Sequence, residues 1–214
     1  MNQKTRNQRL TFNEETHTYY LDGVKIPGVT SVLGEFVYVE YHDIYVCTTN
    51  GQVIAGEIMR RAADIGSAVH KVLELVLLHG IDAVYYPPEI DPAVKALVQW
   101  QKDYRPEIVC VEKRVVSTKY GFAGTLDILA YMPMTKRLSL TDAKTGLGLL
   151  TGPQTAAYEK AYREETGERK IIDRHKLRLP KQEGGSYQFI PLKNPQDWQF
   201  FQNKLFSSRY LAAL

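Results

Sequence analysis

The stretch from Gly121 to Thr145 constrains the fold more than any other part of this sequence. It reads as two short strands joined by a tight turn: the first is centred on residues 126–129 and the second on residues 138–144. The turn falls at residues 133–135. A hairpin of this kind fixes the pairing of its two strands, so the positions of their polar side chains can be derived directly.

Charged side chains gather at one end of this hairpin. Because side chains two apart on a strand share a face, Asp142 and Lys144 emerge on the same side as Leu138 and Leu140. Asp127 lies in the facing strand. Two carboxylates suit a hard cation such as magnesium, which polarises a phosphoryl oxygen, and a lysine can orient water or neutralise charge. For the D-x-K triplet alone, an ordinary surface Asp–Lys pair is the plainer interpretation.

Length and composition indicate one globular domain spanning residues 1–214, of which 44% are hydrophobic. The formal charge of +3 means that a nucleic-acid partner must be met by a local basic patch. Two cysteines, Cys47 and Cys110, are too few for a four-thiolate iron–sulfur cluster or a disulfide framework. The polar first ten residues and the lack of long apolar runs predict a cytoplasmic protein that does not bind a membrane.

The amino-terminal part predicts a β-hairpin lead-in over about residues 11–34, with Asp22-Gly23 in a type I′ turn. Residues 36–47 are rich in aromatic side chains. They either cover the core, which we favour, or form a stacking surface for unpaired bases.

Apolar residues at spacings of three and four predict a long amphipathic helix over residues 52–79, which carries His70. Neutral imidazole is a good metal ligand, although a lone helical histidine is more often a polar surface residue or a satisfied core residue. Capping signals and apolar stripes predict three further helices, over residues 91–105 and 153–166 and from Asn194 onward.

Alternation predicts a strand over residues 108–117, with Glu112 on the face of Cys110 and Arg114. Glu112 is the acidic residue of this strand, either as a salt-bridged sheet residue or as a partner of the lysine or a metal. A later hairpin over residues 170–192 adds two more strands.

Gln154 and Tyr158 are four residues apart and therefore share one face of the 153–166 helix, close to the end of the second hairpin strand. Tyr158 alone would fit a core position. A glutamine one turn before it favours a polar surface.

These motifs, in this order, resemble the PD-(D/E)XK nuclease superfamily, and most closely its RecB-like branch of phage and mitochondrial genome-maintenance exonucleases. That branch has a G-x-x-x-H helix, a G-x-x-D strand, a D-x-K strand and a Q-x-x-x-Y helix. The matching segments here are Gly66–His70, Gly124–Asp127, Asp142–Lys144 and Gln154–Tyr158. Leu126 stands where the family name has proline, and the cysteines that hold a cluster in some relatives are missing.

The resemblance implies an α/β fold with a restriction-endonuclease-like core, in which a central mixed sheet is flanked by helices. It implies magnesium or manganese as the cofactor, without an iron–sulfur cluster, and a lysine that assists the attacking water. The candidate residues are His70, Asp127, Asp142 and the carbonyl of Ala143 for the metal, Asp127, Asp142, Lys144 and Glu112 for catalysis, and Gln154 and Tyr158 for substrate binding.

The implied activity is hydrolysis of DNA phosphodiester bonds, by an exonuclease rather than an endonuclease. The lead-in hairpin looks like that of phage-type members, which suggests a phage or prophage role in recombination, repair or processing. A single-strand-annealing or recombination protein is the candidate partner in such a role. Two alternatives stay open: a catalytically silent nucleic-acid-binding module of the same fold, and a structural or partner-binding domain.

Overall fold

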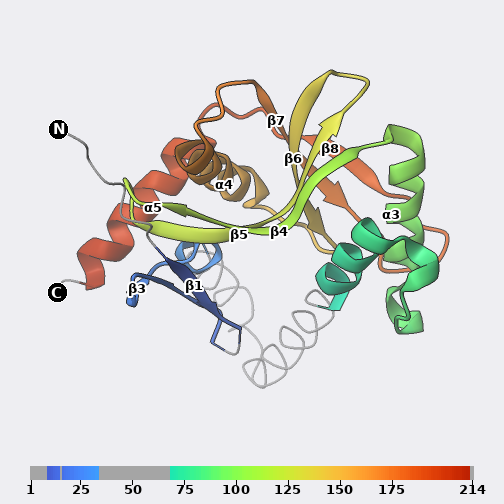
Figure 1. The fold of residues 1–214 in the computed structure, drawn as a ribbon, viewed down its shortest axis with the longest axis horizontal. Coiled ribbons are helices and arrows are strands. Elements are labelled where there is room, and N and C mark those ends of the chain that lie inside the picture. Colours follow the sequence, from blue (N-terminus) through green and yellow to red (C-terminus); the bar gives the residue numbers. More distant parts are fainter. Residues whose placement is uncertain (1–8, 15, 34–67, 213–214) are drawn as a thin grey trace, which may run out of the picture.

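A five-stranded mixed sheet lies at the centre of the computed structural model, which describes residues 9–14, 16–33 and 68–212 (Figure 1). Neighbouring strands are antiparallel except for β6 and β7, which are parallel. The fold is α/β, as the sequence predicts. In spatial order the strands are β4 (Glu107–Ser117), β5 (Phe122–Met132), β6 (Arg137–Lys144), β7 (Ile172–Arg178) and β8 (Gln188–Pro191).

Helices cover both faces of this sheet (Figure 1). Helices α4 (Thr151–Thr166) and α5 (Asp197–Ala212) pack on one face, in a cluster with Leu126 and Leu140. Helix α3 (Asp91–Tyr104) and the helical residues 68–79 pack on the other face. None of the helices in the described ranges combines the length and the apolar character needed to cross a bilayer.

Two predicted helix boundaries can be compared with the structure. Helix α3 begins at Asp91, the first residue of the predicted range, and the 3-10 turn Pro88–Ile90 leads directly into it. The helix that carries His70 ends at Gly80, whose φ of 82° suits a glycine, as predicted. The earlier part of that helix, with Gly66, and the aromatic stretch at 36–47, with Cys47, lie outside the described residues.

The amino-terminal lead-in forms a separate antiparallel sheet of β1 (Leu10–Asn13), β2 (Thr18–Leu21) and β3 (Val24–Ile26). The turn at Asp22 and Gly23 has φ values of 50° and 81°, which agrees with the predicted type I′ turn.

The lead-in joins the central sheet just after β3. The amide of Ala123 donates a hydrogen bond to the Pro27 carbonyl at 3.0 Å, and Gly28 forms a bridge with Ala123. Residues 29–33 are helical, so the lead-in is not a hairpin over its whole predicted length. The physical reason is burial: the apolar side chains of this segment recur at helical spacing and pack into the α4 side of the core.

Strand β4 departs from regular alternation at Glu112, whose φ is 46°. Cys110 packs in the cluster on the α4 face, whereas Glu112 approaches His70 on the opposite face. The prediction that these two side chains share a face is therefore wrong. A positive φ at a residue other than glycine is a costly conformation that reorients the strand locally.

Gly124 of β5 allows α4 to approach the sheet closely. A Cβ at this position would overlap the Tyr158 ring and would lie 3.2 Å from Cγ2 of Val29. We expect Gly124→Ala to lower the free energy of unfolding by about 1–3 kcal/mol, because the helix must shift to make room. Gly146→Ala is the matched control, since no atom lies within 4 Å of its added Cβ. Urea denaturation measures both, and equal losses would contradict the close-packing argument.

Candidate metal and catalytic site

The candidate site lies where strands β5 and β6 separate. Their pairing runs from the turn as far as Ile128 and Thr141, and the same register would place Asp127 opposite Asp142. At this point Asp127 Oδ2 instead accepts a hydrogen bond from the Ala143 amide at 2.8 Å. The Asp127 carboxylate thus takes the place of a backbone acceptor on the neighbouring strand. It lies where the two strands separate, which we call the fork, beside the Asp142 carboxylate, as predicted from the hairpin.

Three side chains from three elements converge next to this fork. His70 Nδ1, on the helix of residues 68–79, lies 3.5 Å from both Glu112 Oε1 of β4 and Asp127 Oδ2 of β5. One ligand atom from each residue lies within 4.8 Å of the others. One imidazole nitrogen with two carboxylates is a donor set that suits a divalent cation. The structure therefore brings together the predicted His70 and Asp127, and adds Glu112 directly to their group.

Asp142 and Lys144 form an ion pair beside this group. Asp142 is completely buried, and its Oδ2 lies 2.6 Å from Lys144 Nζ. Neither carboxylate oxygen has a well-directed hydrogen-bond donor among the described residues. A buried carboxylate with spare lone pairs is costly unless cations compensate its charge. Asp142 lies outside the group of His70, Glu112 and Asp127, and its spare lone pairs and negative charge favour a cation bound beside it.

The pKa values of His70, Asp142 and Lys144 are raised at this site. The negative charge of Asp127 is the main cause that raises the pKa of His70 to about 9, against the effect of burial and with help from Glu112. Burial raises the pKa of Asp142 to about 6. Burial also opposes the charge on Lys144, but the Asp142 and Asp127 carboxylates outweigh it and raise the pKa of the ammonium group. Lys144 is therefore a cation at neutral pH, not a proton acceptor.

The loop after β6 packs against the stem of Lys144. Gly148, with a φ of 55°, comes so close that an added Cβ would lie 3.0 Å from Lys144 Cγ. Lys176 of β7 holds this loop by donating a hydrogen bond to the Leu147 carbonyl at 2.9 Å. Sequence reasoning missed Lys176. Its position depends on the parallel pairing of β6 with β7, which places it opposite Asp142.

Gln154 and Tyr158 lie on one face of α4, and the Gln154 amide donates a hydrogen bond to the Tyr158 hydroxyl at 3.0 Å. Both side chains are buried, and Tyr158 packs on Gly124. Burial raises the pKa of Tyr158 well above its usual value, with Asp142 and Asp127 adding to the effect, so the hydroxyl stays neutral. The expected polar surface is thus an internal contact that supports the fork. Substrate binding by this pair, like metal binding by the Ala143 carbonyl, stays a prediction.

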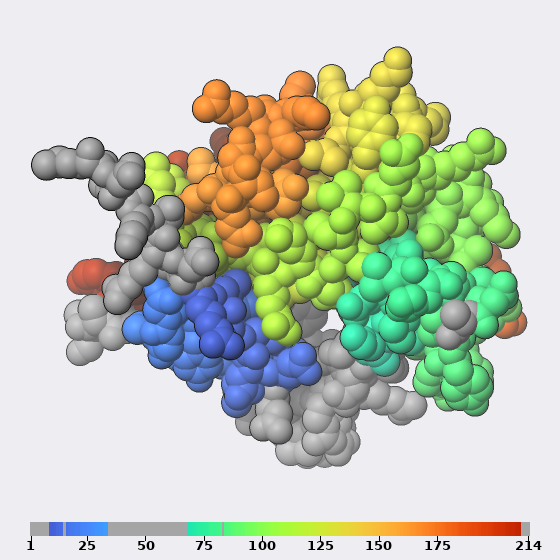
Figure 2. All heavy atoms as spheres, in the orientation of Figure 1, coloured from blue at the N-terminus to red at the C-terminus, as the bar shows by residue number. Residues whose placement is uncertain are grey.

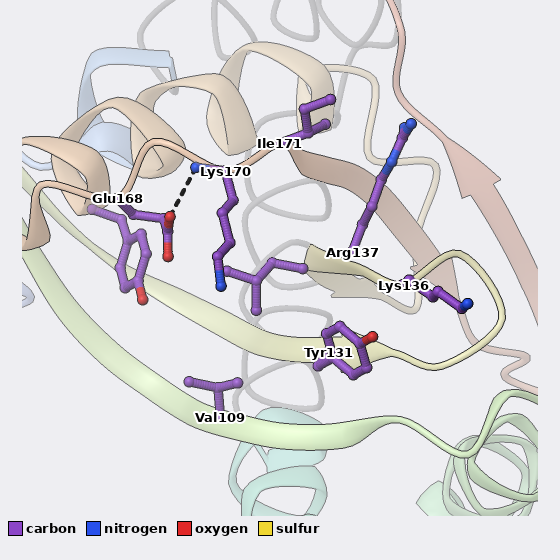
Figure 3. A pocket seen from close by; sticks show the side chains of 9 residues that line it. Val109, Tyr131, Lys136, Arg137, Glu168, Lys170 and Ile171 are labelled. Atoms are coloured by element: carbon purple, nitrogen blue, oxygen red, sulfur yellow. Dashed lines mark hydrogen bonds between the residues drawn. The ribbon is translucent and has the colours of Figure 1, made fainter.

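A pocket of about 640 Å³ lies elsewhere, beside the turn between β5 and β6 and the end of α4 (Figure 3). None of the site residues lines it. The side chains of Lys136 and Arg137 point away from Tyr131, so they do not converge on a common ligand position (Figure 3). The geometry therefore favours the fork as the candidate site.

The chain matches no protein-family model and no curated protein sequence.

In the metal-free protein, proton binding by His70 is expected to make stability depend on pH. The pKa is 6.5 in the unfolded chain and about 9 in the folded one, so the stabilisation is complete below pH 6.5 and disappears as pH rises through 9. Since 30% of the side chain is exposed, we expect a loss of about 2 kcal/mol. Urea denaturation with a chelator at pH 6 and 9.5 measures it. Between these two pH values the free energy of unfolding of His70→Gln should fall clearly less than that of the wild type. Equal losses would show that His70 is not the group involved.

Proposed function

We propose that this chain is a metal-dependent DNA nuclease with a restriction-endonuclease-like core and PD-(D/E)XK chemistry. The observation that carries the proposal is the convergence, at one fork of the sheet, of His70, Glu112, Asp127 and the Asp142–Lys144 pair. These residues come from one helix and three consecutive strands. A surface Asp–Lys pair would be neither completely buried nor adjacent to a third carboxylate and a histidine.

His70, Glu112 and Asp127 would hold a magnesium or manganese ion, with Asp142 close enough to interact with its charge. When bound, such an ion polarises a phosphoryl oxygen and lowers the pKa of a coordinated water. Lys144, held as an ammonium by Asp142, orients the attacking water and neutralises negative charge that develops on the phosphate. Water is the nucleophile, so no covalent enzyme intermediate forms.

We further propose that the enzyme works from DNA ends in phage-type recombination, repair or processing, with a single-strand-annealing or recombination protein as its partner. This finer assignment is supported by the motif resemblance to RecB-like exonucleases. The chemistry at the fork is the same for ends and for internal sites, so the mode of attack needs its own substrate comparison.

The direct test is cleavage of end-labelled linear single-stranded and duplex DNA beside a closed circle, with magnesium, manganese or chelator. We expect metal-dependent loss of linear DNA with the circle spared. Asp127→Asn and Lys144→Gln should lower the rate at least ~100-fold, since charge stabilisation at the phosphate is lost. Asparagine can still accept the Ala143 hydrogen bond, so the fold should survive.

The matched control is Lys136→Gln, which removes a lysine that forms no ion pair within the described residues and lies away from the fork. It should cleave at the wild-type rate. Cutting of the circle would make the protein an endonuclease with the same chemistry. DNA binding without cleavage under any metal would favour the silent binding module, and full activity in the Lys144→Gln variant would contradict the assigned role.

A further inference from the structure

We propose that Arg114 binds the phosphate group next to the one at the metal site, and that the amino-terminal sheet exists in part to hold this guanidinium in place. The inference rests on the proposed nuclease function and adds a residue that the motif resemblance does not include.

Arg114 lies on β4, two residues after Glu112 of the metal-binding group. In the β4–β5 register Arg114 pairs with Thr125, and two residues further the same register places Glu112 opposite Asp127. The Arg114 side chain therefore emerges on the same strand as Glu112 of the metal-binding group. A nucleic-acid strand with one phosphate at the metal carries further phosphates along its length, and the neighbouring one can reach Arg114.

The amino-terminal sheet fixes the Arg114 side chain. The guanidinium lies over the Phe12 ring of β1, with 5.1 Å between its Cζ and the ring centroid. Stacking on an aromatic ring holds the planar group while leaving its N–H donors free for a phosphate. The Tyr19 hydroxyl of β2 forms a hydrogen bond with Thr125 Oγ1 at 2.8 Å, which ties the same sheet to the residue that pairs with Arg114.

The charge of Arg114 is available to a ligand. Its ion-pair partner among the described residues is Glu14, at 3.5 Å, and the Glu14 side chain is 83% exposed. A long contact with an exposed carboxylate contributes little and is easily exchanged for a phosphate. The Arg114 side chain itself is 45% exposed. Figure 2 shows residues of β4 and β5 (yellow-green) at the surface between the amino-terminal sheet (blue) and residues 68–80 (teal).

The test measures binding of a fluorescein-labelled oligonucleotide by anisotropy in magnesium, with every variant in the Lys144→Gln background to prevent cleavage. Arg114→Gln should weaken binding about 10-fold at 0.15 M salt. It should also reduce the slope of log affinity against log salt by about 1, because one phosphate contact is lost. Arg114→Lys retains the positive charge and should keep the wild-type salt slope. If Arg114 only supported the amino-terminal sheet, the salt slope would not depend on this charge.

Arg137→Gln is the matched control, because Arg137 is also about half exposed and lies 3.5 Å from a carboxylate, that of Asp173, but is away from the fork. It should change neither affinity nor slope. An uncharged methylphosphonate at the linkage next to the cleaved one should abolish the difference in affinity between the protein with Arg114 and the Arg114→Gln variant. If a 5′-hydroxyl end abolishes it instead, the ligand is the terminal phosphate.

Unchanged binding in Arg114→Gln, or an equal loss in Arg137→Gln, would overturn the inference while leaving the nuclease proposal intact. Failure of the wild-type protein to bind or cleave DNA in any metal would instead overturn the proposed function. The two failures are therefore distinguishable within the same set of measurements.

Discussion

The hydrogen bond from the Ala143 amide to the Asp127 carboxylate is the interaction on which the candidate site depends. It closes the gap where β5 and β6 stop pairing and satisfies a buried backbone donor, which would otherwise be costly. The same bond holds Asp127 beside Glu112, His70 and the Asp142–Lys144 pair. One local break in the pairing of β5 with β6 thus brings three carboxylates, an imidazole and an ammonium group together in a small volume.

Burial of the Asp142 carboxylate is unfavourable in the folded chain alone, and its raised pKa expresses that cost. Asp142 resists ionisation because it is buried, whereas His70 retains its proton because Asp127 is negative. In the metal-free protein the His70 proton and the Lys144 ammonium supply the positive charge that a divalent ion would supply. The fold accommodates the arrangement because Gly124 and the buried Gln154–Tyr158 contact pack tightly behind the fork.

Much of this architecture could be predicted from sequence. Period-two alternation and turn residues located the β5–β6 hairpin, and the hairpin predicted that Asp127, Asp142 and Lys144 lie at the same edge of the sheet. Three features could not be predicted. Glu112 reaches His70 through a positive φ that strand alternation does not encode, and Lys176 approaches through a parallel crossover that local patterns do not show. The burial of Tyr158 depends on the missing side chain of Gly124, a contact between distant segments.

The most direct test of the metal site is titration calorimetry with Mn²⁺ at pH 7.5, in two buffers of different ionisation enthalpy. Coordination through His70 requires the loss of a proton held with a pKa of about 9, so we expect saturable binding that releases about one proton per ion. Asp127→Asn should weaken that binding strongly. Absence of saturable binding by the wild type, or unchanged binding in Asp127→Asn, would contradict the claim that this fork holds a metal.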